Sequence, residues 1–590
     1  MEDIMGKDKK VLENIICENL NSDNWNRFCD ENKWIDKGNL ERVCRRYGFP
    51  DKNELTVVIE NYYIDVAFRD VYYHYWSKAH FDWPRHCKRL FLFKNRHLEE
   101  EFYYSQKHKD LKEDFLGTIV VRPAYSSETD HTFGRTLLTP YKMSDDTGKE
   151  KPFLYLETST YTFHLLGDTY SIDAFPFCSQ DGVVMKCAET AIYEMCEFAA
   201  ARDVMHSRIL PSDIQRKLEA RSPERILPSH GLYCNDISYL LRKFGFSPMI
   251  YAESINGDKV TDVFPYRKAR IGSVSGSAFE VGRESYDSKW DSEHITDLKK
   301  WFHYYVESGI PLLTITAPNQ ETIKHAALVI GHGKKRKSVN DCRIYRLGGL
   351  PCMDTAELYE DYIVQDDNQV PYVEEKMDRF TSKNNYKLDA FIVPLERHVF
   401  LEAASAVDIC DVFIEQENLL IRQALKFIRD AYVQRQKTVS DYQMKADYDE
   451  FISGGNVDDD NPVTVRYFLT NSAEYKRYRI YKAETMEDKR FYAEIPMPKS
   501  VWIAEISSYK WYEEGYAFSE IVLDATASSR TQVDSIILLR AAHFGVYRLP
   551  DETYEDFRKK MLKNKCCSNL SAVFDIYSNY RGKEMTEVDS

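Results

Sequence analysis

The segment that most restricts the fold is CAETAIYEMCEFAAAR, residues 187–202. Its Ala191, Met195, Phe198 and Ala199 recur at three- and four-residue spacing, which is typical of a helix with one apolar stripe. Short apolar runs closed by glycine or proline lie on both sides of it in the sequence, as expected for strands. We therefore predict a fold of mixed helices and strands.

Domain organisation is indicated by length and by changes along the chain. The 590 residues are enough for about three or four domains. Apolar spacing predicts a helical region over residues 1–110, which includes ELTVVIENYYIDVAFRDVYYHYW at 54–76. β-Branched runs such as FLGTIVVRP predict a small β region over 111–174. The helix above lies in a unit over 175–385, and helices and strands that follow predict an α/β region over 386–590.

Charge and cysteine usage exclude several classes of function. A net charge of −15 argues against a nucleic acid or an anionic membrane as the main partner, because either would need a basic face. No run of about 18 apolar residues occurs, so we expect no membrane span. The first residues include acidic ones and lack an apolar signal core, and the 13 cysteines have no repeated spacing. We therefore expect a cytoplasmic protein with reduced thiols.

The sequence contains no recognisable metal or cofactor pattern. His74, His80 and His86 recur at a spacing that does not return to one face of a helix. There is no paired Cys-x-x-Cys for zinc and no glycine-rich phosphate loop. We expect neither a metal nor a cofactor.

Cys187 is the candidate nucleophile, because it is the first residue of the predicted helix. The unpaired N–H groups and the dipole of a helix N-terminus favour a thiolate. Such a nucleophile needs a base from another element, and His325 opens the predicted strand HAALVIGHG. Gln180, upstream of the helix, could join its amide to the backbone N–H of Cys187 in an oxyanion hole. For Cys187 taken alone, a small apolar core residue is the alternative.

An acid must orient the histidine, and two aspartates are candidates. Asp366 ends the apolar strand YIVQDD, whereas Asp341 lies in a polar turn nearer to His325 in the sequence. We prefer Asp366, because a strand end is a fixed position. Asp367 would point to the opposite side if the strand continues. His332 is expected on the other face of the histidine strand, in a loop.

Carboxylates also occur on predicted strands of the C-terminal region. Glu505, Glu520 and Asp524 lie beside apolar runs there. We interpret them as residues at strand edges or strand ends rather than as a second active site.

The order of these elements resembles the papain-like cysteine peptidases, most closely the branch that processes bacteriocins at double-glycine sites. A glutamine and a cysteine at a helix start are followed by GLYCNDISYLLRKFG, YYVESGIPLLTIT, a strand opening His-Ala and a strand-end aspartate. The resemblance covers roughly residues 175–375. The chain departs from the family at Ala188, where the family has glycine, and in an insertion between His325 and Asp366.

The resemblance implies an α+β fold with a papain-like core, in which the cysteine helix packs on an antiparallel sheet. A helical/β N-terminal region and an α/β C-terminal region would flank this core. The implied function is a cysteine-dependent hydrolase, a peptidase or isopeptidase, that cleaves an amide bond in a protein or peptide substrate. Cys187, His325 and Asp366 would form the triad, and Gln180 would stabilise the oxyanion.

Two alternatives to a hydrolase stay open at this point. One is a non-catalytic binding protein on a degenerate papain-like fold, which the departure at Ala188 and the insertion favour. The other is an acyl transferase with the same triad, which differs only in the nucleophile that resolves the acyl enzyme. Reactivity of Cys187 separates the first alternative from a hydrolase.

Overall fold

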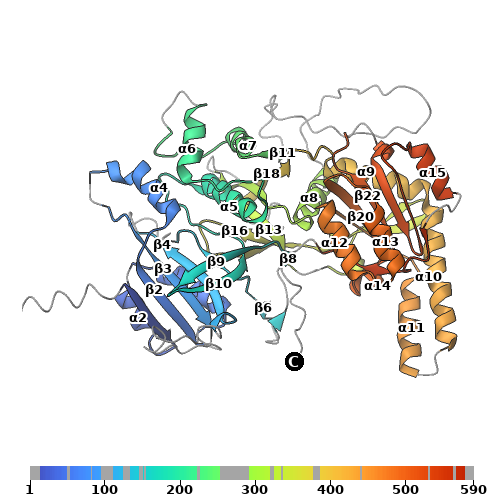
Figure 1. Cartoon of the computed structure of the whole chain (residues 1–590), viewed down its shortest axis with the longest axis horizontal. Coiled ribbons are helices and arrows are strands. Elements are labelled where there is room, and N and C mark those ends of the chain that lie inside the picture. The colour runs from blue at the N-terminus through green and yellow to red at the C-terminus, as the bar shows by residue number, and fades with distance from the viewer. Residues whose placement is uncertain are drawn as a thin grey trace, which may run out of the picture.

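A computed structural model gives the fold, which combines helices with largely antiparallel sheets (Figure 1). In Figure 1 a central green and yellow region lies between a blue N-terminal region and an orange and red C-terminal region. No helix within the described residues has both the length and the apolar character needed to cross a membrane. The described residues are 14–32, 34–49, 54–80, 83–94, 111–123, 133–141, 143–144, 150–151, 155–221, 226–252, 292–318, 324–333, 337–376, 386–438, 442–528, 532–562 and 567–578.

The N-terminal region is built on an antiparallel sheet of order β1-β2-β3-β4-β5. A hairpin of β9 and β10 packs beside it. The strands are β1 (Ile15–Leu20), β2 (Leu55–Tyr63), β3 (Cys87–Lys94), β4 (Phe115–Val121), β5 (Leu137–Leu138), β9 (Ser159–Leu165) and β10 (Asp168–Ala174), with a small pair β6 (Met143–Ser144) and β7 (Glu150–Lys151). The helices are α2 (Trp25–Glu31), α3 (Lys37–Arg46) and α4 (Val66–His74).

The helix predicted over residues 54–76 is wrong in its first half, because Leu55–Tyr63 forms strand β2. Val57 and Ile59 pack into one hydrophobic core, and Val58 between them packs into another. Both faces of the strand are buried there, so the apolar residues run without the alternation that identifies a strand. The second half of the prediction is closer, since helix α4 lies within it.

The central sheet is antiparallel, with the order β11-β18-β12-β13-β16-β17 and β8 paired to β13. Its strands are β8 (Tyr155–Leu156), β11 (Phe246–Ala252), β12 (Leu312–Pro318), β13 (His325–His332), β16 (Asp361–Gln365), β17 (Val373–Lys376) and β18 (Tyr386–Glu396). Its helices are α5 (Cys187–Arg202), α6 (Pro211–Glu219), α7 (Cys234–Lys243) and α8 (Ser292–Glu307). The predicted helix over 187–202 is confirmed by α5.

Helices α5 and α8 both contact β13, and their apolar side chains enter different hydrophobic cores. Leu328 and Ile330 of β13 pack into the core of α5, whereas Val329 between them packs into the core of α8. Successive side chains of a strand point to opposite faces of the sheet, so β13 is buried on both faces. The sheet therefore holds α5 on one face and α8 on the other.

The turn between α8 and β12 depends on a glycine. Gly309 has a φ of +69°, which is the conformation that ends many helices and that glycine adopts without strain. A Cβ at this position would lie 2.4 Å from Cδ of Glu157. Any other residue would therefore be strained in its backbone and too close to Glu157.

The C-terminal sheet has the order β14-β15-β19-β20-β22-β23-β24-β25, antiparallel except for the β15–β19 pair. Its strands are β14 (Tyr345–Leu347), β15 (Leu350–Asp354), β19 (Val463–Asn471), β20 (Ser500–Ser508), β22 (Ser519–Asp524), β23 (Ile536–Ala541), β24 (Phe544–Tyr547) and β25 (Cys567–Ser568), beside a small pair β21 (Tyr516–Ala517) and β26 (Phe574–Asp575). The insertion between His325 and Asp366 thus contributes a hairpin, β14 and β15, to this sheet.

Helices cover the C-terminal sheet, and two long ones extend from it as a pair, α10 and α11 (Figure 1). The helices of this region are α9 (Ala403–Gln416), α10 (Asn418–Thr438), α11 (Tyr442–Gly454), α12 (Ser472–Lys482), α13 (Met486–Glu494), α14 (Tyr509–Glu513) and α15 (Tyr554–Leu562).

A buried ionic network joins the central and C-terminal sheets at Glu307, the last residue of α8. Arg466 of β19 donates from Nε to Glu307 Oε1 over 2.6 Å, and His332 Nε2 lies 2.7 Å from the other carboxylate oxygen. Arg466 also donates to Glu505 over 2.7 Å. His332 is therefore a buried strand residue, and its predicted position in a loop is wrong.

We expect Glu307→Ala to lower the free energy of unfolding by about 3–5 kcal/mol, because it removes one of the two carboxylates that pair with the buried guanidinium of Arg466. Urea denaturation followed by tryptophan fluorescence measures the change. The matched control is Glu494→Ala, which breaks an exposed pair with Arg490 on helix α13 and should cost less than about 0.5 kcal/mol. Equal, small effects of both variants would contradict a structural role for the network.

Candidate active site

Cys187 is the first residue of α5, and the loop before it is held by hydrogen bonds. Asp181 Oδ1 accepts the backbone N–H groups of Val183, Val184 and Met185 over 2.7–2.9 Å. The Glu189 carboxylate in the first turn accepts a hydrogen bond from the hydroxyl group of Ser229. The start of the helix is therefore fixed at Cys187, whose thiol is partly exposed.

His325 begins β13, which contacts α5 directly. The Cys187 side chain lies near enough to the imidazole to raise the pKa of His325, so folding brings the predicted nucleophile and base near each other. The Nε2 atom of the ring lies 2.9 Å from Asp366 Oδ1. The imidazole thus has the thiol and a carboxylate as neighbours.

Asp366 directly follows β16, as the sequence predicted, and begins a tight turn. Its Oδ1 also accepts the backbone N–H of Asn368 over 3.0 Å. Asp341, the alternative acid, lies in a 3₁₀ turn spanning Val339–Asp341, outside this cluster. Of the two candidates, Asp366 is the one that meets His325.

Electrostatics favour a charged His325. Burial disfavours the imidazolium, but hydrogen bonds with Asp366 and Cys187 and the charges of Asp366 and Asp367 outweigh it and raise the pKa of His325 to about 11. Burial also disfavours the Asp366 carboxylate, yet its bond to His325 and the charge of that ring keep the pKa of Asp366 below its usual value. The two residues therefore form an ion pair at neutral pH.

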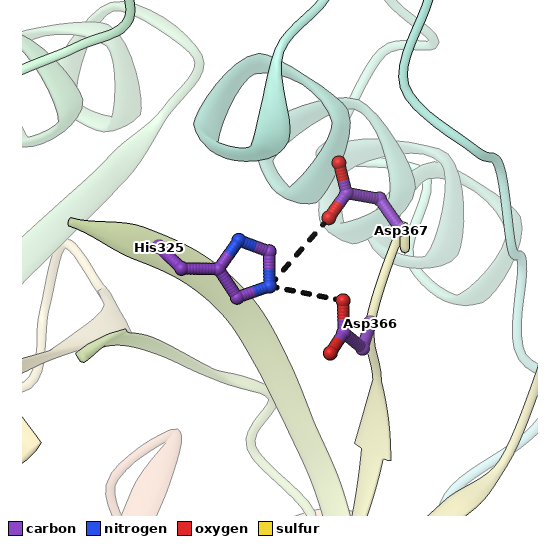
Figure 2. Close-up of side chains that lie close together, drawn as sticks. All are labelled: His325, Asp366 and Asp367. Carbon is purple, nitrogen blue, oxygen red and sulfur yellow. Dashed lines mark hydrogen bonds and ion pairs between the residues drawn. The ribbon is translucent and has the colours of Figure 1, made fainter. Parts of the chain in front are cut away.

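Asp367 is the residue that the sequence interpretation misplaced. Its Oδ1 lies 3.7 Å from His325 Nε2, on the same ring nitrogen that Asp366 contacts (Figure 2). The strand ends at Gln365, so Asp367 lies in the turn and does not alternate to the opposite face. It is only 4% exposed, and neither carboxylate oxygen has a hydrogen-bond partner. Burial raises the pKa of Asp367 to about 7.

Gln180 reaches the site through a residue that the sequence interpretation did not consider. Its Nε2 donates to Asn368 Oδ1 over 2.6 Å, and Asn368 Nδ2 lies 3.5 Å from His325 Nδ1. The backbone of Gln180 is held by Arg122, which donates to its carbonyl oxygen over 3.2 Å. The polar run DDNQ at 366–369 is a turn signal that could have placed Asn368 beside Asp366.

The other residues singled out in the sequence lie elsewhere. Cys178 and Cys196 are buried, and burial raises the pKa of the Cys178 thiol to about 12. Glu505 and Glu520 face each other on the inner strands β20 and β22, so their interpretation as strand-edge residues is wrong. Arg466 and Arg479 pair with them inside the C-terminal sheet.

One group within the described residues has donor atoms close enough to hold a metal ion together. His325, Asp366 and Asp367 each offer one ligand atom, and the three atoms lie within 4.8 Å of one another. A nitrogen and two carboxylate oxygens suit a borderline cation such as Zn²⁺. The same three side chains therefore allow proton chemistry or cation binding.

Comparisons with known proteins do not identify a family. No family model matches the chain, and no curated protein matches its sequence. Function therefore has to be inferred from the geometry of the site.

We expect Asp366→Asn to lower the pKa of His325 by about 1–3 pH units, because the imidazolium loses the charge that stabilises it most directly. NMR titration of ¹³C-labelled histidine, with the His325 signal assigned by its loss in His325→Gln, measures the change. Asp341→Asn serves as the control and should leave the titration unaltered. Equal effects of both aspartate variants would contradict the His325–Asp366 pair.

Proposed function

We propose that this protein is a cysteine-dependent hydrolase with a papain-like core that cleaves an amide bond in a protein or peptide substrate. The observation that carries the proposal is the position of the His325 ring, whose Nε2 lies 2.9 Å from Asp366 Oδ1 and whose pKa is raised in part by the neighbouring side chain of Cys187. A thiol nucleophile needs this order of base and orienting acid. The sequence of elements from α5 through α7, α8, β12 and β13 to β16, similar to that of the papain-like peptidases, adds support.

The reaction starts from an ion pair of Cys187 thiolate and His325 imidazolium. The thiolate attacks the substrate carbonyl carbon, and the electron pair of the C=O bond moves to oxygen. When this oxyanion collapses, the C–N bond breaks and the imidazolium donates its proton to the leaving amine. Neutral His325 then takes a proton from water, which attacks the thioester, releases the acid and restores the thiolate. Asp366 holds the ring throughout.

Oxyanion stabilisation is assigned to Gln180 and to the backbone N–H of Cys187. The first N–H groups of a helix have no partner within the helix and are free to face an anion. In the free protein the Gln180 amide donates to the Asn368 side-chain oxygen. A substrate carbonyl oxygen replaces the Asn368 oxygen at Gln180 Nε2 when it binds.

Iodoacetamide labelling tests the nucleophile. A free thiol has a pKa of about 8.5, so about 1% is thiolate at pH 6.5. Because His325 stays charged well above neutral pH, Cys187 should alkylate at least roughly tenfold faster than the partly exposed Cys342 at that pH. Peptide mass spectrometry measures both rates in one sample.

The excess reactivity should disappear in His325→Ala and persist in His164→Ala, a histidine on an exposed face of β9. If Cys187 reacts no faster than Cys342 in the unmodified protein, the hydrolase proposal fails and a binding protein on the same fold is favoured. If the excess survives His325→Ala, the thiolate is stabilised without the imidazolium and the assigned pair is wrong.

The oxyanion assignment predicts a difference between two kinds of electrophile. Gln180→Ala should slow the acylation burst of p-nitrophenyl acetate by a factor on the order of 10², because acyl transfer forms an oxyanion. Alkylation by iodoacetamide forms none, so its rate in the same variant should stay within about twofold. Slowing of both reactions would mean that Gln180 acts on the thiol itself.

A further inference from the structure

The unusual feature of the site is that one imidazole nitrogen faces two carboxylates. A single aspartate is enough to orient a histidine, and Asp366 does so at 2.9 Å. Asp367 adds a second carboxylate at 3.7 Å from the same Nε2 atom. Figure 2 shows both side chains directed at this nitrogen from consecutive positions of the chain.

Asp367 has no hydrogen-bond partner that would explain its burial. Both of its oxygens are buried without a hydrogen-bond partner, and the ion pair of Oδ1 with His325 Nε2 is long at 3.7 Å, whereas buried carboxylates in proteins are normally closely paired or coordinate metals. Glu189 and Glu194 place further acid groups near Asp367.

We propose that His325, Asp366 and Asp367 form a binding site for a divalent transition-metal cation, with Zn²⁺ the ion that best fits one imidazole nitrogen and two carboxylate oxygens. Zn²⁺ binds such ligands at about 2.0–2.2 Å, which sets neighbouring ligand atoms about 3–3.5 Å apart. The separations of 2.9 and 3.7 Å from Nε2 to the two oxygens bracket this value. The side chains of His325 and Asp366 are 25% and 19% exposed, so an ion can reach them.

The ion replaces the proton that His325 shares with Asp366. Coordination uses the Nε2 electron pair, so the Nε2 proton is released to solvent and affinity falls as the pH falls. Binding involves no change of oxidation state. With a cation on Nε2, loss of the proton on Nδ1 would leave an imidazolate, so the ring no longer gives up and regains a proton during a reaction at Cys187. Binding depends on the donor geometry alone, whereas this inhibition rests on the proposed function.

Titration of the full-length protein with Co²⁺ tests the site, because Co²⁺ in such a site has visible d–d absorption and a thiolate ligand adds a near-ultraviolet charge-transfer band. We expect saturable d–d bands without the thiolate band in the unmodified protein and in Cys187→Ser. Asp367→Asn, which keeps the shape of the side chain, should weaken affinity by more than about tenfold. Asp341→Asn is the control and should bind as the unmodified protein does.

Three results would overturn the proposal. The first is that the unmodified protein does not bind Co²⁺ saturably. The second is that the unmodified protein shows a thiolate charge-transfer band that disappears in Cys187→Ser. The third is that Asp367→Asn binds Co²⁺ with unchanged affinity. The second result would mean that the ion sits between Cys187 and the Nδ1 side of His325. Asp366→Asn provides a second ligand variant if Asp367→Asn does not fold, and circular dichroism checks the folding of each.

The proposal of a cation site and the proposal of a hydrolase can be tested separately, and either can be wrong while the other holds. Zn²⁺ should suppress the acylation burst of p-nitrophenyl acetate, and zinc competition with Co²⁺ gives the affinity without any activity. Co²⁺ binding with an unreactive Cys187 would leave the site standing and remove the hydrolase. A reactive Cys187 without Co²⁺ binding would do the reverse.

Discussion

The packing of α5 on the central sheet is the interaction on which the chemistry of this chain depends. Cys187 and His325 lie far apart in the sequence, and each is the first residue of its element. Their contact is set by close packing between the two elements, where Leu328 and Ile330 of β13 are almost completely buried. Successive helix residues differ by about 100° around the axis, so a one-residue change in packing would turn Cys187 away from the imidazole.

The sequence was sufficient to predict elements whose pattern is local. The apolar residues of α5 recur at helical spacing. Gly309 stands in the turn before β12, where the backbone has a positive φ that favours glycine. The apolar run of β16 ends at Gln365, where polar residues begin. Strand β2 could not be identified in this way, because both of its faces are buried. The assignment of β14 and β15 to the C-terminal sheet depends on strand partners far along the chain, which no local pattern encodes.

Cys187, His325 and Asp366 lie at the helix start, the strand start and the strand end where the sequence predicted them. The positions of Asp367 and Asn368 beside His325 were not predicted. Asp367 and Asn368 were beyond the reach of strand periodicity, because the chain turns after Gln365 and consecutive side chains then point the same way. The result is a cluster in which Asp366 and Asp367 share one ring nitrogen and Asn368 connects that ring to Gln180. A turn signal locates such residues but does not give their directions.

The buried ionic cluster of the C-terminal sheet and the cluster at His325 differ in how their charges are balanced. In the C-terminal sheet the carboxylates of Glu505 and Glu520 meet the guanidinium groups of Arg466 and Arg479, so each buried charge has a partner of opposite sign. Such compensation is what a structural network requires.

The cluster beside Cys187 lacks this balance, since the carboxylates of Asp366 and Asp367 share one imidazole. Burial raises the pKa of Glu189, Glu194 and Asp367, so the fold holds these groups in a form that costs free energy when charged. Acid groups with pKa values perturbed in this way cluster at functional sites. The larger network therefore supports the fold, and the smaller, unbalanced one is where the chemistry is expected.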